Sequence, residues 1–294
     1  MFERLIEQGL VKEKKYDNGL SVFKYTRKVF YDALWNTDEL LLEARGMVID
    51  TKTGEKVIWP FIKVFNYTEN GAGEDLSQST SVEAIRKVNG FMAACRLWNG
   101  ELVVSTTGTL DSEFAEIARK HIEKLEGVAT LATTATLIFE ICDHTDPHIV
   151  AEEEGAYLIG ARNMSNGGMF SEALLDYMGE LIGAKRPQRM MIRFDALEEL
   201  VSLVKHEGFM VRDIETGETL FKWKSPHYLA KKFLMRMGDK KVDFMYDNFD
   251  TFKETLDEEF YEICEWIVTE HERDIWKSLG DQERRSRIEG YFNG

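Results

Sequence analysis

The chain has 294 residues, of which 44% are hydrophobic and 12% aromatic, a composition that excludes a disordered protein and fits one large domain or a large domain with a small appendage. Its formal net charge of -15 argues against a protein that coats nucleic acid by bulk electrostatics, so any contact with nucleic acid must depend on a few placed lysines and arginines. No apolar run approaches the about 18 residues that span a membrane. The charged N-terminus does not resemble a secretory signal and the cysteines lack metal-ligand spacing, so we expect a cytoplasmic protein with reduced thiols.

Alternation of apolar and polar residues and a high β-branched content predict strands in the ranges 20–26, 46–61, 90–98, 101–108, 136–143, 157–163, 208–213 and 219–225. Hairpin turns are predicted at Thr53-Gly54, Asn99-Gly100 and Thr216-Gly217. Hairpins of this kind make the predicted sheets mostly antiparallel. The range 81–87, which precedes a further Asn-Gly pair at 89–90, shows no clean strand pattern.

Helical periodicity predicts helices at 111–127, 171–184 and 195–207, the first with Asp111 or Ser112 as its N-cap and Gly127 as its terminator. From Pro226 onward the strand pattern stops and charged, amphipathic helices follow.

We therefore expect an α+β body over residues 1–228, with mostly antiparallel strands, and a small all-α domain over residues 229–294. The sequence has neither a G-x-G-x-x-G motif nor a Walker lysine loop, so any nucleotide must be bound by another route.

Lys87-x-x-Gly90 stands at the entrance to the predicted hairpin, where a lysine can point into a cleft and a glycine lets the backbone approach a ligand closely. Taken alone, this pattern equally describes a surface lysine before a loop glycine. Glu140, inside the apolar run "LIFEICD", is costly to bury unless it meets a cation or a metal, and an edge strand facing water is the alternative. Lys222 and Lys224 are two residues apart and share one strand face, which could also be a solvated face.

The order of these motifs is more specific than any one of them. The set consists of Lys87-x-x-Gly90, Glu140, Glu207-Gly208 and Lys222-x-Lys224. It resembles the covalent nucleotidyltransferase superfamily of ATP-dependent ligases and mRNA capping enzymes. Upstream, "ARGMVID" (44–50) and "FIKVFNYTEN" (61–70) resemble the RNA ligase 1 family of T-even bacteriophages. Two positions depart from the pattern: Asn89, where many members carry aspartate, and Thr107, where the phage family has lysine.

The resemblance implies a nucleotidyltransferase (adenylation) domain that uses ATP, with AMP as the covalent intermediate, and Mg2+ or Mn2+. Lys87 would be the nucleophile, and Lys222 and Lys224 would contact the α-phosphate. Together with bound magnesium, these two lysines would lower the pKa of Lys87. The remaining implied nucleotide contacts are Arg45 and Lys63 at the triphosphate, Phe65 at adenine, Gly90 beside the nucleophile, Glu140 at the ribose, and Tyr228. Glu140 and Glu207 would hold the metal.

The implied function is ATP-dependent joining of 5′-phosphate and 3′-hydroxyl RNA ends through lysyl-AMP and 5′-adenylylated RNA, in the repair of RNA such as cleaved tRNA. We expect a monomer in a bacterial or phage-infected cytoplasm, working alongside a polynucleotide kinase/3′-phosphatase. A DNA nick ligase or a capping-type enzyme ranks lower, because the helical tail lacks the five-strand pattern of an OB domain. A non-catalytic RNA-binding protein with residual motifs is the third reading, and the intact lysines and glutamates speak against it.

One further group of residues resembles a metal site. His144 and His148 flank Asp146, but no further histidine or cysteine follows at ligand spacing. The sequence therefore does not predict a metal site there.

Overall fold

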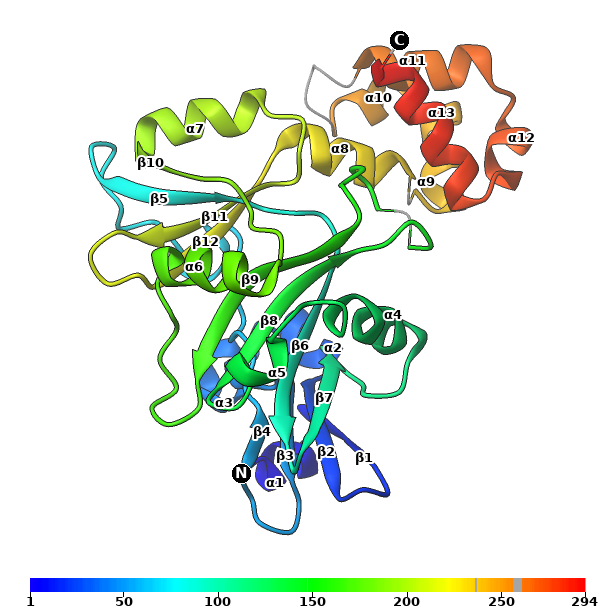
Figure 1. The fold of residues 1–294 in the computed structure, drawn as a ribbon. Coiled ribbons are helices and arrows are strands. Elements are labelled where there is room, and N and C mark those ends of the chain that lie inside the picture. Colours follow the sequence, from blue (N-terminus) through cyan, green and yellow to red (C-terminus); the bar gives the residue numbers. More distant parts are fainter. Residues whose placement is uncertain (147, 236, 256–260, 294) are drawn as a thin grey trace.

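The structure is a computed structural model that describes residues 1–146, 148–235, 237–255 and 261–293. It consists of three four-stranded antiparallel sheets with helices packed against them, and a group of helices gathered at the C-terminal end (Figure 1). The predicted α+β class with mostly antiparallel strands and a helical C-terminal region is confirmed. No helix among the described residues is both long enough and apolar enough to cross a membrane.

Each sheet is formed by strands that pair in hairpins or through crossovers. Sheet A has the order β1 (Val11–Lys15), β2 (Leu20–Tyr25), β3 (Arg45–Asp50) and β4 (Lys56–Ile58). Sheet B has the order β10 (Arg189–Arg193), β5 (Ser81–Arg86), β11 (Gly208–Asp213) and β12 (Thr219–Lys224). Sheet C has the order β7 (Glu101–Thr106), β6 (Phe91–Trp98), β8 (Ala135–Cys142) and β9 (Gly155–Asn163).

The helices of the body are short except for three that cover the sheets. The short elements are α1 (Glu3–Glu7), α2 (Arg27–Tyr31), η1 (Leu34–Thr37), α3 (Leu40–Glu43), η2 (Glu69–Gly71) and α5 (Val128–Leu131). The covering helices are α4 (Glu113–Ile122), α6 (Glu172–Ile182) and α7 (Phe194–Leu203). The C-terminal group contains α8 (Pro226–Met235), α9 (Asp239–Asp247), α10 (Phe249–Lys253), α11 (Tyr261–Glu270), α12 (Arg273–Ser278) and α13 (Asp281–Asn293).

The helices and sheets pack against one another through their apolar faces. Ala118 of α4 and Leu175 of α6 pack with inward residues of sheet C in one buried cluster. On the other side of this sheet, Ile138 packs against Val48 of sheet A. Leu197 of α7 covers one face of sheet B, so the opposite face of that sheet is left to line a cavity toward sheet C.

The C-terminal helices have a buried cluster of their own, which includes Trp276, Met245 and Ile267. This cluster also takes in Ile149 from the β8–β9 loop, so the helices contact the body through that loop. The predicted boundary between residues 228 and 229 falls within the first turn of α8, and the division into two domains stays a prediction.

Several sequence-based predictions need correction. The range 81–87 contains a strand after all, β5, which pairs with both β10 and β11. Its central residue Glu83 is buried and forms an ion pair with Arg189 at 2.6 Å, so a charge interrupts the apolar pattern. The helix predicted to end at Gly127 ends at Ile122, and Gly127 instead precedes α5 with a left-handed φ of 71°. Ser112 is the N-cap of α4, accepting from the amide of Ala115.

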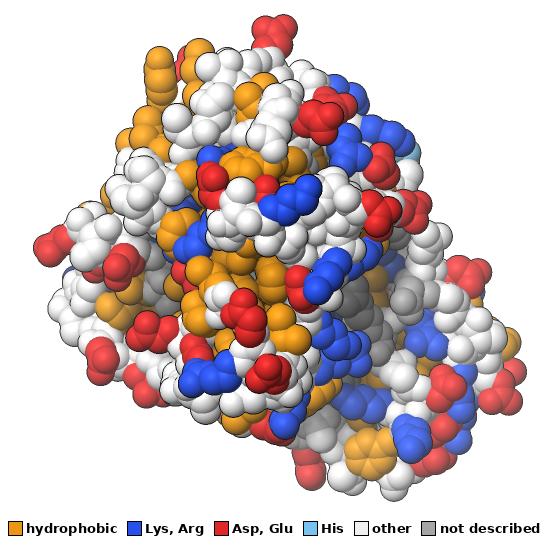
Figure 2. Space-filling model, turned by 90° about the horizontal axis from the view of Figure 1, so that it is seen from below, with side chains coloured by type: hydrophobic (Ala, Val, Ile, Leu, Met, Phe, Trp, Pro, Cys, Tyr) orange, Lys and Arg blue, Asp and Glu red, His pale blue; other side chains and the backbone are white. Residues whose placement is uncertain are grey.

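The surface agrees with the acidic composition. Figure 2 shows acidic and basic side chains interspersed over one face, with hydrophobic side chains gathered toward its middle. Among the described side chains on that face, the lysines and arginines have acidic neighbours, so binding of a polyanion there would depend on individual cations.

Candidate active site

A cavity of about 350 Å3 lies between sheets B and C. Seven of the ten side chains predicted for the site line it: Arg45, Lys87, Gly90, Glu140, Glu207, Lys222 and Lys224. They come from three sheets and from sequence positions far apart, so their convergence is a product of the tertiary fold. A concave site with convergent charged groups is where ligand binding is expected first.

Lys87 follows the last residue of β5 and is fixed by backbone pairing, because its amide donates to the carbonyl of Gly208 at 2.8 Å. Its Nζ lies 3.0 Å from Oε2 of Glu207. The lysine side chain is 21% exposed and that of Glu207 is 3% exposed, so the ion pair is formed at the wall of the cavity with the lysine facing the open side. Lys87 is thus held in place and still reachable by a ligand.

Asn89 occupies the position where many superfamily members carry aspartate, and the structure shows what the amide does there. Its Nδ2 donates to Oε2 of Glu207 at 2.9 Å, and its Oδ1 accepts from the amide of Val150 at 2.9 Å. Its backbone amide donates to Oε1 of Glu152 at 3.3 Å. Asn89 is buried, so an aspartate at this position would have no proton to offer Glu207. The asparagine therefore orients Glu207 toward Lys87.

The two glycines of the motifs are required by close approach of neighbouring backbone. A Cβ on Gly90 would lie 2.3 Å from the carbonyl oxygen of Ile141, which leaves no room for any side chain. A Cβ on Gly208 would lie 2.0 Å from the carbonyl oxygen of Trp223, and its φ of 131° also favours glycine. Gly90 lines the cavity, and the carbonyl of Gly208 accepts from the amide of Lys87, so both close approaches lie beside Lys87.

Glu140 lies on β8, an inner strand of sheet C, and is buried. The alternative of an edge-strand glutamate facing water is therefore excluded. Its Oε1 accepts from the amide of Gly90 at 3.1 Å. Burial raises the pKa of Glu140, although the cation of Lys87 acts in the opposite direction.

The electrostatics of Lys87 differ from the sequence-based prediction. Burial lowers the pKa of Lys87, but the carboxylates of Glu140 and Glu207 outweigh burial and hold the pKa above its ordinary value. Lys222 and Lys224 alone therefore do not bring the pKa of Lys87 below its ordinary value, and the predicted lowering with bound magnesium stays a prediction. The physical reason is proximity, since Glu207 is in direct contact with Lys87.

The two lysines of β12 are themselves perturbed. Burial lowers the pKa of Lys222 to about 7, aided by the nearby cations of Lys63, Lys224 and Arg45. Its Nζ donates to the carbonyl of Val64 at 3.0 Å. Burial also lowers the pKa of Lys224, whose Nζ lies 3.6 Å from Oε1 of Glu207. Crowded, partly desolvated cations of this kind favour an incoming anion, because its charge relieves their mutual repulsion.

Three predicted residues lie outside the lining of this cavity. Lys63 is buried, contacts Glu69 at 3.3 Å, and lies 5.0 Å from the ring centroid of Phe65 and 5.1 Å from that of Trp35. Phe65 itself packs edge-on against Trp35. Tyr228 is buried, and its ring centroid lies 5.2 Å from Nζ of Lys224. Their roles at the nucleotide stay predictions.

Apolar side chains make up much of the cavity wall, and sequence reasoning did not single them out. They include Phe61, Val64, Ile85, Met92, Ile159, Met169, Leu175 and Met210. Phe61 closes onto Gly160, where a Cβ would lie 2.4 Å from the ring. The signal was present, because Phe61 begins the same "FIKVFNYTEN" block that carries Lys63 and Phe65. An apolar wall facing charged groups suits a ligand with a flat ring and an anionic end.

Thr107 also lines the cavity and lies against the start of β3. A Cβ on Gly46 would lie 2.9 Å from Cα of Thr107, and the φ of Gly46 is 91°, so the strand start carrying Arg45 packs tightly on the Thr107 backbone. Thr107 lines the cavity, so the position that departs from the phage pattern does face the site.

Glu140 and Glu207 also fit as magnesium ligands by their chemistry. Both carboxylates open on the same cavity, and Mg2+ in nucleotide enzymes is held by one or two carboxylates together with substrate phosphates and waters. Lys222 and Lys224 stand on the same side, where they could contact those phosphates.

Residues 43–229, well over half of the chain, match the model of the T4 RNA ligase 1 family, described as RNA ligase. Among curated proteins, none matches this chain. Two structures of an archaeal ATP-dependent RNA ligase, forms 2 and 1, each align with a TM-score of 0.58 at 14% identity, covering 98% of this chain and 73% and 74% of the archaeal chains. A chain of Aquifex aeolicus assigned as an ATP-dependent DNA ligase aligns with a TM-score of 0.57 at 12% identity, covering 99% of this chain and 77% of its own.

At these low identities the structural alignments establish a shared fold, while the family match rests on the sequence segment that contains the whole lysine and glutamate set. The chain belongs to the T4 RNA ligase 1 family, and it is an enzyme of the RNA ligase class.

Proposed function

We propose that the protein joins RNA ends through successive nucleotidyl transfers, with Lys87 as the covalent nucleophile. One observation carries this proposal: Nζ of Lys87 faces a cavity that also holds Glu140, Glu207, Lys222 and Lys224. A nucleophile, an adjacent proton acceptor and phosphate-binding cations are the parts that this chemistry needs.

In the first transfer, neutral Nζ of Lys87 attacks the α-phosphorus of ATP. The Nζ–P bond forms while the bond from that phosphorus to the pyrophosphate oxygen breaks, giving lysyl-AMP and pyrophosphate. Oε2 of Glu207, 3.0 Å away, is the nearest acceptor for the proton that Nζ must lose. Lys222 and Lys224 would stabilise the charge that gathers on the phosphate oxygens, and the triphosphate would in turn restore the proton of Lys222.

The acidic surroundings of Lys87 must be offset before it can act. Burial lowers the pKa of Lys87, but Glu140 and Glu207 outweigh burial, so the pKa is raised and the protonated amine is favoured. Mg2+ or Mn2+ held by these two carboxylates would supply the positive charge that removes this effect. Asn89 keeps Glu207 oriented while its charge is shared in this way.

Two further transfers complete the proposed reaction. An oxygen of an RNA 5′-phosphate attacks the AMP phosphorus, Nζ of Lys87 leaves, and 5′-adenylylated RNA forms. The 3′-hydroxyl of a second end then attacks the 5′-phosphate and displaces AMP, which leaves a phosphodiester bond. Because all three transfers act on phosphates, one set of cations in one cavity can serve them in turn.

Covalent labelling tests the nucleophile directly. Incubation with α-labelled ATP and Mg2+ should label the wild-type chain and Lys87→Ala should not be labelled. Lys52→Ala, which removes an exposed lysine at a turn of sheet A, is the matched control and should label normally. Labelling that persists in Lys87→Ala contradicts the assignment.

The substrate is tested by a second, separate comparison. We propose RNA with 5′-phosphate and 3′-hydroxyl ends, supported by the family to which the chain belongs. Joining of broken RNA but not of nicked duplex DNA is expected, and efficient sealing of the DNA nick alone would overturn it. Cleaved tRNA anticodon stem-loops, open single strands and nicked RNA duplexes distinguish the RNA class.

A role in RNA repair follows from the chemistry of the ends. Many cleaved RNAs carry a 5′-hydroxyl and a phosphorylated 3′ end, so an enzyme with kinase and 3′-phosphatase activity must act before this ligase. We propose such a partnership, together with residues 229–294 as a separate helical domain whose own buried cluster supports that division. Ligation of cyclic-phosphate RNA only after such a kinase/phosphatase is added would support the order of reactions.

A further inference from the structure

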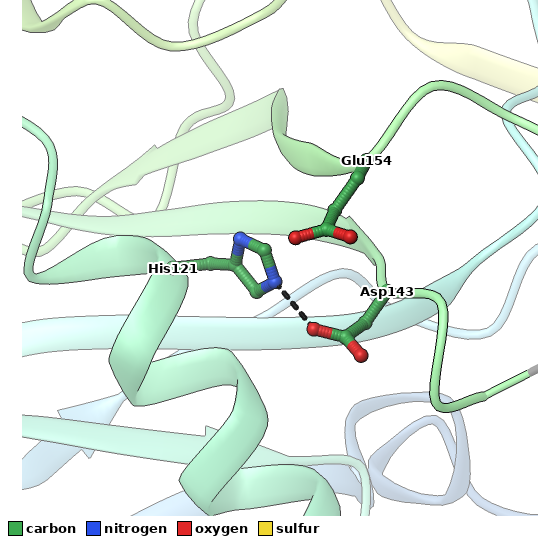
Figure 3. A group of neighbouring side chains, drawn as sticks. All are labelled: His121, Asp143 and Glu154. Carbon is green, nitrogen blue, oxygen red and sulfur yellow. Dashed lines mark hydrogen bonds and ion pairs between the residues drawn. The ribbon is translucent and has the colours of Figure 1, made fainter.

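Away from the cavity of Lys87, three potential metal ligands converge at the base of the β8–β9 loop. His121 comes from the last turn of α4, Asp143 directly follows β8, and Glu154 directly precedes β9. Figure 3 shows the three side chains pointing toward one another. Among the described residues, this is the single group of at least three His, Cys, Asp and Glu side chains whose donor atoms all lie within 4.8 Å of one another.

A fourth donor stands beside them. Nδ1 of His144 lies 2.9 Å from Oε2 of Glu154 and 3.7 Å from Oδ1 of Asp143, while Nε2 of His121 lies 2.7 Å from Oδ2 of Asp143. In a tetrahedral zinc site, bonds of about 2.0–2.2 Å place neighbouring ligand atoms about 3.3–3.6 Å apart. The distances in this group lie on both sides of that range, so small side-chain movements would complete the site.

A hydrogen bond between His121 and Asp143 accounts for only part of this arrangement. It leaves the second carboxylate, Glu154, within 4.8 Å of the first, and Nδ1 of His144 lies close to both. A protonated His144 offsets the repulsion of the two carboxylates in part, and a divalent ion bound by all four side chains would offset it more fully.

We propose that His121, Asp143, Glu154 and His144 form a binding site for one divalent transition-metal ion of the Zn2+ type. Two imidazoles and two carboxylates are a donor set that suits Zn2+ and its neighbours, whereas Mg2+ and Ca2+ prefer oxygen ligands alone. The site is separate from Glu140 and Glu207, so its metal is distinct from the one used with ATP.

Binding at this site would tie α4 to both ends of the β8–β9 loop. That loop carries Val150 and Glu152, which hold Asn89 beside the nucleophile. A metal at the base of the loop would therefore stabilise the segment that positions Asn89, and it would raise the unfolding temperature by binding to the folded state.

Metal-free protein titrated with Zn2+ against a chromophoric chelator tests the proposal, with excess Mg2+ present to keep Zn2+ from Glu140 and Glu207. The wild-type chain should bind one Zn2+ and gain thermal stability. Glu154→Gln should weaken binding at least tenfold. Glu153→Gln, which removes a neighbouring exposed carboxylate, is the matched control and should bind like the wild type.

Because Asp143 also accepts bonds from Thr145, Asp143→Asn is a second variant whose folding is checked first by circular dichroism. A folded Asp143→Asn chain should also lose the site. Wild-type protein that binds no Zn2+ above the level of Glu154→Gln overturns the proposal, as does Glu154→Gln protein that binds as tightly as wild type. Neither result bears on labelling of Lys87, so the proposed ligation is tested independently.

Discussion

The Asn-Gly pairs at 89–90 and 99–100 stand at the two ends of β6, and the structure uses them in opposite ways. At the outer end, Asn99 and Gly100 are exposed with left-handed φ values of 51° and 83°, as a two-residue hairpin turn requires. A Cβ on Gly100 would meet nothing within 4 Å. At the inner end, Asn89 is buried, and a Cβ on Gly90 would lie 2.3 Å from the carbonyl oxygen of Ile141.

The same dipeptide thus answers two different demands. At 99–100 glycine is needed for its backbone angles, and at 90 it is needed because a neighbouring strand leaves no space. Asn99 adopts the left-handed backbone of the hairpin turn. The side chain of Asn89 instead forms hydrogen bonds with Glu207 and with the amide of Val150 in the β8–β9 loop. Matched substitutions at the two ends separate local chain geometry from the assembly of the site.

Alanine at each glycine should give the largest contrast. Gly90→Ala forces β6 away from β8 next to Lys87, and a displacement of about 1 Å at a reacting group costs about 100-fold in rate. Gly100→Ala should keep full activity and lose about 1–2 kcal/mol of stability from its left-handed φ. Rates of labelling with α-labelled ATP and thermal unfolding measure both effects. Equal labelling rates for the two variants would contradict the different roles assigned to Gly90 and Gly100.

Alanine at each asparagine should give a smaller contrast. Asn89→Ala leaves the buried Glu207 carboxylate short of one donor. We expect roughly tenfold slower labelling, which corresponds to about 1.4 kcal/mol and lies within the range of about 1–3 kcal/mol for an unsatisfied buried group. Asn99→Ala disturbs only an exposed turn and should label at the wild-type rate. The check is the single-turnover rate at saturating ATP, and a Val150→Ala chain, which keeps the backbone donor, serves as a further control.

The ion pairs near the two ends offer a third contrast. Glu152 is 4% exposed, pairs with Arg86 at 2.7 Å and accepts from the amide of Asn89. Glu55 is 53% exposed and lies 3.9 Å from Arg96. Glu152→Ala should slow labelling a few-fold by loosening the segment of Asn89, and Glu55→Ala should change neither the rate nor the stability measurably. A larger effect at Glu55 would show that the outer end matters to catalysis.

The smallest expected effect is a shift in pH dependence. Burial lowers the pKa of Lys87, but Glu140 and Glu207 outweigh it, so the pKa already lies above its ordinary value. Asn89→Asp adds a further negative charge, which stabilises the protonated lysine and raises that pKa again. The labelling rate of Asn89→Asp should therefore rise at a higher pH than that of wild type, whereas Asn99→Asp should not move the profile. A shift toward lower pH would contradict this reasoning.

Sequence patterns predicted the strands whose apolar residues face a core, such as β6 and β8, together with the turns between paired strands. They missed β1, β5 and β10. The buried carboxylate of Glu83, which pairs with Arg189, breaks the apolar pattern of β5, and both β1 and β10 are mostly exposed. The buried charge of Glu83 is tolerated in a strand because Arg189, from the neighbouring strand, pairs with it. Residue spacing within 81–87 does not reveal that partner.

For the candidate site, too, the sequence predicted some features and not others. Lys87, Gly90, Glu140, Glu207, Lys222 and Lys224 could be selected from motif order, and they do meet in one cavity. The direction of the pKa shift of Lys87 could not be predicted, because it depends on Glu207 being nearer than the lysines. His121 was missed as a partner of Asp143 because the two lie 22 residues apart on different elements.

The contrast between the two turns also bears on how the protein ages. Asn-Gly is the dipeptide most prone to spontaneous deamidation, because the glycine nitrogen can attack the asparagine side chain and form a succinimide. The amide of Gly90 is engaged by Glu140 and the side chain of Asn89 is bonded on both its atoms, so this attack is blocked at the inner end. Asn99 and Gly100 lie exposed to water. Stored protein should therefore accumulate aspartate and isoaspartate at position 99 while the asparagine near Lys87 stays intact.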